Sequence, residues 1–411
     1  MTAGTPAGRR SALDGRLRRL APPRVGPFRA GAFRPRPDAE RSAAWLGIAL
    51  GVAFGVCFLT GLLSHAIQHP PVWFSWPPRP LWLYRVTQGL HVATGIAAIP
   101  LLLAKLYVVV PRFWTWPPFR SAGHLVERIT LVPLVGGSLF MLFTGIGSIS
   151  RMRPWGFSFP AAHYAASWIT IGALVAHVGA KLHVAARALA RERPAVAAPS
   201  VPAPSVSAPS RSGVTRRAFL GSAAAAAGVV TVATVGQTVR PLASVSVLAP
   251  RDPRVGPQGV PVNRTARSAG VIEAAMDPAF RLRVTGDVTT PLELSLDDLR
   301  AAPRHRAVLP VTCVDGWSAT ATWGGIAVRD LLAMAGAPQG AAAEVVSLQE
   351  PGTAYASSEL DAAQAADPDA LLALELDGEP LHIDHGYPVR LIAPNRPGVL
   401  QTKWVTAVVV R

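Results

Sequence analysis

The chain has 411 residues, of which 50% are hydrophobic, and a mean hydropathy of +0.30. This composition excludes an ordinary soluble protein and predicts that part of the chain lies in a membrane. The formal net charge of +16 is uneven, because residues 1–244 carry 26 Lys and Arg against 5 Asp and Glu, whereas residues 245–411 carry 14 against 19. We interpret the basic excess as a membrane-topology signal and expect no nucleic-acid partner.

The N-terminal half is predicted to be an all-α transmembrane bundle in contact with membrane lipid. Residues 1–42, rich in Arg and Pro, are expected to form a disordered basic cytoplasmic tail, and residues 43–190 a four-helix domain. Apolar runs long enough to cross ~30 Å of hydrocarbon at ~1.5 Å per residue occupy residues 43–64, 86–110, 125–147 and 164–186. The inner segments carry 19 Lys and Arg against 4 in the outer loops, which places the N-terminus inside.

Seven of the ten histidines lie in this half, where ionisable groups are costly and often functional. His163 and His177 are 14 residues apart, so they share a helix face at ~21 Å separation. That spacing suits two stacked haems, with His91 and His124 as candidate partners and His65 as a competitor for the outer site. The alternative is that the histidines bond to backbone or reach the interface.

The bundle resembles membrane b-type cytochrome subunits of respiratory oxidoreductases. The resemblance implies one or two haems b, with His91, His163 and His177 as ligands of the iron and His124 as a further haem-binding residue. It also implies electron exchange with the quinone and quinol pool.

A Pro, Ala and Ser-rich stretch, residues 191–214, is expected to be an extended linker. The next segment, residues 215–240, contains a fifth and weaker apolar run at 218–237. Thr215, Arg216, Arg217, Phe219 and Leu220 at its start resemble a twin-arginine export signal. The alternative is the charged flank of an ordinary fifth helix. Either interpretation places the remaining chain outside the cytoplasmic membrane.

Residues 245–411 are predicted to form a mixed α+β domain. Short β-rich runs at 282–288 and 307–314 alternate with helical patterns such as 327–336. Cys313 is expected at a strand end, where the turn formed by VDGWS would expose its thiol at the rim of a sheet. A thiolate there is a ligand for a soft or high-valent metal. The alternative is a buried cysteine that acts as a small hydrophobic residue.

Four stretches of this domain together resemble the sulfite oxidase and methionine sulfoxide reductase molybdopterin family: residues 282–299, 311–332, 385–394 and 398–405. The resemblance implies that Cys313 is the catalytic protein ligand of molybdenum and that molybdopterin supplies the remaining sulfur. It stops at Arg411, so the additional C-terminal domain of sulfite oxidases is not expected.

The family pattern also implies residues that contact the pterin: Asn263, Arg267, His385, Arg390, Gln401, Thr402 and Lys403. His385 stands where close relatives have asparagine, although histidine can also donate a hydrogen bond. A threonine contact expected near residues 347–355 is not assigned. No arginine cluster for sulfite is evident, since Arg304, Arg306, Arg329 and Arg396 are scattered and are interpreted as solvated charges.

The sequence thus predicts a membrane-anchored oxidoreductase that transfers an oxygen atom to or from a small molecule outside the cell membrane. Reduction of a sulfoxide-type substrate is the favoured direction, and sulfite oxidation is the alternative. A second hypothesis is an electron-transfer cytochrome whose C-terminal domain binds a partner without molybdenum.

Overall fold

The computed structural model describes residues 23–29, 31–33, 39–118, 122–152, 154–190 and 215–411. The expected linker at 191–214 and most of the expected tail at 1–42 lie outside the described residues. The chain divides into two units, which are described separately. The first contains residues 1–58 and 94–231. The second contains residues 59–93 and 232–411, so it joins the C-terminal domain with the segment around the first predicted outer loop.

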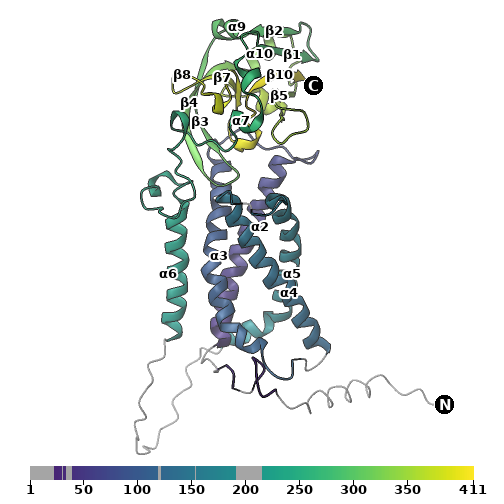
Figure 1. The fold of residues 1–411 in the computed structure, drawn as a ribbon. Coiled ribbons are helices and arrows are strands. Elements are labelled where there is room, and N and C mark those ends of the chain that lie inside the picture. The colour runs from purple at the N-terminus through teal and green to yellow at the C-terminus, as the bar shows by residue number, and fades with distance from the viewer. Residues whose placement is uncertain (1–22, 30, 34–38, 119–121, 153, 191–214) are drawn as a thin grey trace, which may run out of the picture. The chain divides into compact units, whose positions relative to one another are not determined.

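Five helices in the described part of the chain are long and apolar enough to cross a membrane, which confirms the expected all-α region (Figure 1). They are α2 (Ala39–Gln68), α3 (Leu83–Phe113), α4 (Ala122–Ile149), α5 (Phe159–Ala190) and α6 (Arg216–Val235). Four begin and end several residues beyond the predicted apolar runs, because the polar and aromatic residues that flank each run continue the helix. Prolines 100, 111 and 133 lie inside helices, as membrane helices tolerate.

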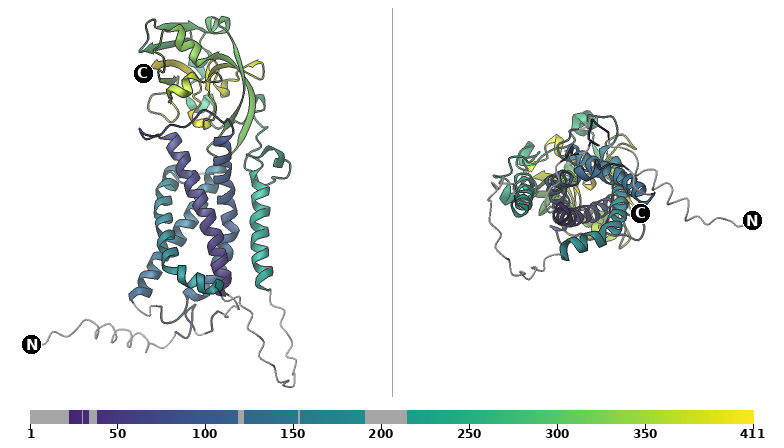
Figure 2. Two further views of the ribbon diagram at one scale, coloured as in Figure 1. Left: turned by 180° about the vertical axis from the view of Figure 1, so that it is seen from behind. Right: turned by 90° about the horizontal axis from the view of Figure 1, so that it is seen from below.

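In the first unit, small residues let the helices approach one another. A Cβ at Gly137 of α4 would lie 2.4 Å from Thr170 Oγ1 of α5, and one at Gly147 would lie 2.5 Å from the Phe159 ring. Leu50 and Ala53 of α2 pack against α3 in a buried cluster. The view from below in Figure 2 shows the bundle end on.

The second unit contains two sheets with short helices, which confirms the α+β class. One sheet has the order β2-β1-β10-β5-β6, in which only the β1–β10 pair is parallel, and the other has the order β3-β4-β7-β8 with β9 beside β7. The strands are β1 (Arg281–Gly286), β2 (Leu292–Ser295), β3 (His305–Thr312), β4 (Ser318–Ala327), β5 (Ala343–Ser347), β6 (Ser357–Leu360), β7 (Leu371–Leu376), β8 (Glu379–Pro380), β9 (Arg390–Ile392) and β10 (Val405–Val410). The short helices are α7 (Ala266–Ala269), α8 (Ile272–Met276), α9 (Leu296–Ala301), α10 (Val328–Met334) and α11 (Ala362–Ala366).

The larger core of this unit contains fully buried residues from both sheets, such as Val284, Val345 and Leu372, with Leu331 of α10. A second core, on β3, β4 and β7, contains Leu309, Trp323 and Leu371 together with Cys313. Alternate burial along β1 and β5 keeps one face of each strand in the core. The cysteine is therefore attached to a rigid antiparallel sheet.

Candidate active site

Cys313 lies in the connection between β3 and β4, which pair as far as Thr312 and Ser318. Its backbone N–H donates to the Trp317 carbonyl at 2.9 Å, and its own carbonyl accepts from the Gly316 N–H at 3.0 Å. The expected turn is thus present. The expected exposure of the thiol is wrong, because Cys313 is only 5% exposed. Cys313 belongs to the second core together with Trp317 and other buried residues.

Hydrogen-bonding groups surround the Cys313 sulfur. Asn263 Nδ2 donates to Sγ at 3.0 Å and to Asp315 Oδ2 at 2.9 Å, and the Asp315 N–H donates to Sγ at 3.4 Å. Trp317 Nε1 holds the other side of the amide by donating to Asn263 Oδ1 at 3.3 Å. Burial raises the pKa of the Cys313 thiol, and the Asp315 carboxylate raises it further. A metal that binds this sulfur must therefore displace a proton.

Arg390 and Lys403, two of the predicted pterin contacts, meet at Gly386. A Cβ on Gly386, whose φ is +114°, would lie 3.1 Å from the Cβ atoms of both basic residues, so this close approach favours glycine. Lys403 Nζ donates to the carbonyl oxygens of Arg264 at 2.9 Å and Asp384 at 2.7 Å. The fold therefore brings two cations together, although they are separated in sequence.

Neither cation has a carboxylate within ion-pair distance in the part of the chain that the structure describes. Arg390 is 3% exposed and stacks over the Trp323 ring at 5.1 Å. Burial lowers the pKa of Arg390 to about 10, so its guanidinium stays charged at neutral pH. Burial and then the Arg390 charge lower the pKa of Lys403. Such uncompensated buried charge is costly unless an anion binds beside it.

His385 is fully buried next to this pair. Its Nε2 lies 2.7 Å from the Pro257 carbonyl and therefore donates to it, while its backbone carbonyl accepts from Arg390 Nη1 at 3.1 Å. Burial, and then the Arg390 charge, lower the pKa of His385 to about 4. The imidazole is thus neutral at physiological pH, and with Nε2 as the donor its Nδ1 is a hydrogen-bond acceptor.

Gln401 and Thr402 are both 2% exposed. Gln401 Nε2 donates to the Arg396 carbonyl at 3.1 Å. The Thr402 hydroxyl lies 2.6 Å from that of Ser358, and its carbonyl accepts from the Leu391 N–H of β9 at 2.8 Å. These contacts fix the segment that leads to Lys403.

Arg267, also predicted to contact the pterin, lies on the exposed side of α7 and does not join the group. Two arginines that were not expected at the site also have a buried guanidinium atom. Arg264 has a buried Nε and a carbonyl bonded to Lys403. The expectation that Arg396 is a solvated charge is wrong, because Arg396 is 3% exposed and donates to Gln364 Oε1 at 2.9 Å and to the Glu359 carbonyl at 2.7 Å.

Unsatisfied buried polar atoms test whether this region fits an anionic, polar cofactor. Five such atoms occur on the residues just described: Arg264 Nε, His385 Nδ1, Arg390 Nε, Arg396 Nε and Gln401 Oε1. Buried polar atoms are normally hydrogen-bonded, so a set of unsatisfied ones beside two uncompensated cations is typical of a ligand site. The residues present therefore fit molybdopterin, with its phosphate and its hydrogen-bonding pterin.

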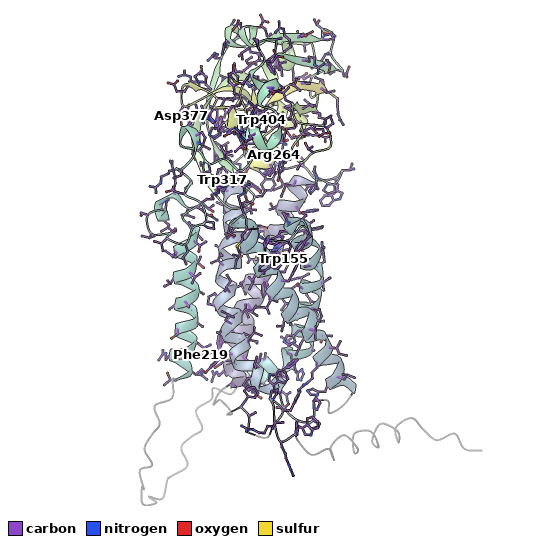
Figure 3. The ribbon with its side chains drawn as sticks, in the orientation of Figure 1. Trp155, Phe219, Arg264, Trp317, Asp377 and Trp404 are labelled. Carbon is purple, nitrogen blue, oxygen red and sulfur yellow. The ribbon has the colours of Figure 1, made fainter. Side chains whose placement is uncertain are left out.

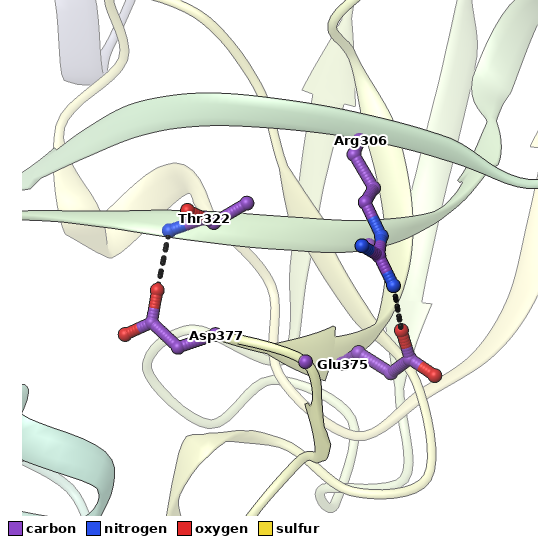
Figure 4. Close-up of a pocket in the computed structure, with 6 residues that line it drawn as sticks. Arg306, Thr322, Glu375 and Asp377 are labelled. Carbon is purple, nitrogen blue, oxygen red and sulfur yellow. Dashed lines mark hydrogen bonds and ion pairs between the residues drawn. The ribbon is translucent and has the colours of Figure 1, made fainter.

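The other arginines considered for substrate lie elsewhere. Arg306 lines a cavity of about 250 Å³ with Thr322, Glu375 and Asp377 (Figure 4). Its guanidinium lies 3.9 Å from Glu375 Oε2, and Arg304 also pairs with Glu375. Arg329 pairs with its neighbour Asp330 at 3.3 Å. Thr322 opposes Val308 in the β3–β4 ladder, four pairs from the end that carries Cys313, so this cavity is separate from the thiol.

Two predicted haem histidines have matching surroundings. His91 of α3 lies over Gly61 of α2, where a Cβ would be 2.9 Å from its Cε1, and His91 Nδ1 is 3.4 Å from Thr60 Oγ1. In the first unit, a Cβ on Gly145 would be 3.6 Å from His163 Cε1, and His163 Nδ1 is 2.9 Å from Thr144 Oγ1. Each imidazole thus faces a Thr-Gly pair of the preceding helix.

This arrangement fits a haem ligand, because a hydrogen bond at Nδ1 directs Nε2 toward the metal. His177 lies on α5 with His163, and His124 lies in the first turn of α4. The described residues contain no group of three or more His, Cys, Asp or Glu placed to hold a metal ion. Haem needs no such group, since its porphyrin supplies the equatorial ligands.

Comparison with known proteins gives a match for residues 269–411 to the family model described as oxidoreductase molybdopterin binding domain. Mitochondrial sulfite oxidase of Mus musculus is 34% identical over 158 residues, which are 32% of this chain and 29% of that protein. A protein of Azospira oryzae, named as protein-methionine-sulfoxide reductase subunit YedZ1, is 33% identical over 132 residues, 32% of this chain and 49% of that protein. This chain therefore spans less than half of either relative.

A solved structure, the sulfane dehydrogenase SoxCD from Paracoccus pantotrophus, is 22% identical and covers 39% of this chain and 44% of that chain, with a TM-score of 0.31. The family match confirms the expected class of the C-terminal part, which is a sulfite-oxidase-like molybdopterin oxidoreductase domain. Figure 3 labels Arg264, which precedes the matched segment in the sequence, and Trp404, which belongs to that segment.

Proposed function

We propose that this chain is a membrane-anchored molybdopterin-dependent oxidoreductase that reduces a sulfoxide-type substrate on the extracytoplasmic side. Cys313 is the protein ligand of molybdenum in this proposal. The observation that carries it is the group of buried, unsatisfied polar atoms and uncompensated cations around Arg390 and Lys403, in a domain that matches the molybdopterin family. When bound, the cofactor would supply two-electron oxygen-atom transfer at molybdenum.

The chain's own residues have distinct roles in this proposal. Asn263 holds the Cys313 sulfur and the Asp315 carboxylate in one arrangement through its amide. Arg390, Lys403 and Arg264 neutralise the anionic cofactor. His385 and Gln401 offer a neutral acceptor each, at Nδ1 and Oε1. Arg267, on the exposed face of α7, is assigned only a peripheral contact.

The electrons come, in this proposal, from quinol through haem b in the membrane helices. Reduction of one sulfoxide to a thioether and water consumes two electrons and two protons, and oxidation of one quinol supplies both. His91 and His163 are the proposed iron ligands best supported by their surroundings, and His177 and His124 are proposed as the remaining ones. The segment 215–240, with Arg216 and Arg217 before an apolar helix, is proposed as a twin-arginine-like export segment.

Sulfite oxidation is a second candidate, because the chain is similar to mitochondrial sulfite oxidases. In the two directions, the substrate changes the oxidation state of the haem in opposite ways. The detergent-solubilised full chain is first reduced with a stoichiometric amount of a menaquinol analogue and is then mixed with methionine sulfoxide. If the chain reduces sulfoxides, the haem is reoxidised. Haem reduction when sulfite is added to the oxidised protein would support the second candidate instead. A spectrum without any reducible haem band would overturn the cytochrome role in both.

A further inference from the structure

The loop that carries Cys313 is held by side chains and backbone from outside its own hairpin. Gln88 Nε2 of α3 donates to the Val314 carbonyl at 2.5 Å. The Thr238 hydroxyl donates to the Gly316 carbonyl, and the Ser318 N–H donates to the Gln237 carbonyl at 2.9 Å. All of these residues belong to the second unit. The cysteine loop is therefore fixed against the start of α3.

Gly316 shows how close this approach is. Its φ is +92°, and a Cβ there would lie 2.8 Å from Val92 Cγ2 and 3.1 Å from Gln237 Nε2. A side chain at this position would push the loop away from α3. The glycine in the sequence VDGWS is thus explained by the contact with a helix more than 200 residues earlier in the chain.

Gln88 lies three residues before His91 on α3, about 4.5 Å along the helix axis. Its side chain is buried at 5% exposure, and the amide orientation is fixed because a carbonyl can only accept. The connection from the Cys313 sulfur to α3 thus runs through the bonds of Cys313 and Val314, across one hydrogen bond, and into Gln88. No other non-covalent step is needed to reach the helix that carries His91.

We propose that the hydrogen bond from Gln88 to Val314 is the electron path between the Cys313 loop and a haem held by His91. This inference rests on the proposed function. Gln88 is then a positioning residue for electron transfer. Two successive single-electron transfers along this path balance the reduction of one sulfoxide to a thioether and water, with the electrons and protons supplied by one quinol.

The test compares Gln88→Met with Gln68→Met in the full chain. Methionine is close to glutamine in length but has no amide donor. Gln68 is the matched control because, among the described residues, its Nε2 donates only within its own helix, to the Ser64 carbonyl at 3.0 Å and hydroxyl at 3.3 Å. Haem and molybdenum contents are measured first in each protein. Stopped-flow spectroscopy then follows haem reoxidation by methionine sulfoxide after reduction with a menaquinol analogue.

We expect Gln88→Met to slow haem reoxidation by roughly tenfold, less than the ~100-fold that about 1 Å of misplacement can cost, and Gln68→Met to match wild type. Haem reduction by the quinol analogue should not change. Sulfoxide reduction driven by reduced benzyl viologen, which reaches molybdenum directly, should also be retained, because Thr238 and Gln237 still bond to the Cys313 loop. A defect that only loosened the domain would lower the viologen-driven rate as well. That result would overturn the inference.

Gln88→Asn provides a second variant that keeps an amide but shortens its reach, and it should also slow haem reoxidation. Wild-type rates in Gln88→Met or Gln88→Asn would overturn the electron path while leaving the proposed function intact. Absence of sulfoxide-dependent haem reoxidation in the wild type would instead contradict the proposed direction. In that case the same comparison with sulfite as the reductant decides whether Gln88 carries electrons the other way.

Discussion

Asn263 Nδ2 lies 3.0 Å from Cys313 Sγ and 2.9 Å from Asp315 Oδ2, so one amide donates to a thiol and to the carboxylate beside it. The amide separates two groups that would both be negative once the thiol loses its proton. Burial and the Asp315 carboxylate raise the pKa of the Cys313 thiol, and the hydrogen bond from Asn263 lowers it. The Asn263 amide thereby makes the sulfur a better metal ligand.

Replacing Asn263 by Leu should therefore make Cys313 less reactive in molybdenum-free protein. Without the donor, the thiol pKa rises further and the thiolate fraction at pH 8 falls. Mass spectrometry of iodoacetamide labelling measures this in a Cys57→Ser background, where Cys313 is the remaining cysteine. Labelling of Asn263→Leu at or above the rate of its parent would contradict the assignment. In loaded protein, molybdenum affinity should fall by about tenfold or more.

Arg390→Gln should stabilise the cofactor-free protein but weaken its binding of the cofactor. In cofactor-free protein, the change removes a buried charge that lacks a carboxylate partner, and the free energy of unfolding should rise by roughly 1–3 kcal/mol. In protein expressed with cofactor supply, the same change should lower bound molybdenum.

Arg396→Gln is the matched control for Arg390→Gln, because Arg396 is equally buried and also has an unsatisfied Nε. Among the described residues it makes two hydrogen bonds, to Gln364 Oε1 and the Glu359 carbonyl, whereas Arg390 makes one, to the His385 carbonyl. Loss of these two bonds should destabilise cofactor-free protein by about 1 kcal/mol or more. Thermal unfolding in detergent measures both variants. Equal destabilisation by the two changes would show that Arg390 is structural and not reserved for an anion.

The buried imidazole of His385 should make the stability of the cofactor-free protein depend on pH. Its folded-state pKa is about 4, below the ordinary 6.5, so between these values the unfolded chain binds a proton that the folded chain does not. The free energy of unfolding of cofactor-free protein should therefore rise with pH from 4 to 6.5 and decline as the pH falls, by up to about 3 kcal/mol.

The variant His385→Asn should remove this contribution, and His382→Asn should keep it because His382 is exposed. Thermal unfolding at pH 5 and pH 7.5 gives the comparison. If the difference between the two pH values is the same for both variants and wild type, His385 does not titrate in this way.

Thr144 provides a test of the haem assignment in the helices. Its hydroxyl lies 2.9 Å from His163 Nδ1, so Thr144→Val should weaken haem retention by about tenfold through loss of a hydrogen bond that orients the ligand. Thr170→Val is the control, since the Thr170 hydroxyl bonds to the Ala166 carbonyl of its own helix at 2.8 Å. The pyridine haemochrome content of the two purified variants is the measurement. Equal retention would remove His163 from the ligand set.

The sequence was sufficient for the parts of the structure that depend on local pattern. Apolar runs predict the five long helices, and β-rich runs bounded by Gly and Pro predict β1 and β3 to within a few residues. The position of Cys313 just after β3 also follows from local pattern. Its burial does not, because the core that contains Cys313 is built from residues of β3, β4 and β7, and Asn263, which donates to the thiol, lies 50 residues earlier.

Long-range contacts determine the positions of the site residues that the sequence alone does not predict. Arg264 and Arg267 are three residues apart, yet only Arg264 lies beside Lys403, because the short helix α7 turns Arg267 toward the surface. Arg396 is indistinguishable from a surface arginine in sequence, and its burial depends on acceptors at Glu359 and Gln364. The contact of Gln88 with Val314 joins residues 226 positions apart, so no local pattern signals it.

The most direct measurement of the central claim is molybdenum X-ray absorption on the full chain and on Cys313→Ser, with Cys57→Ser as the matched control. The wild type and Cys57→Ser should contain molybdenum with identical sulfur coordination, and Cys313→Ser should show one sulfur ligand fewer or lose the metal. Negligible molybdenum in the wild type after expression with cofactor supply, or unchanged sulfur coordination in Cys313→Ser, would contradict the account. The former result would favour a C-terminal domain that binds a partner without catalysis.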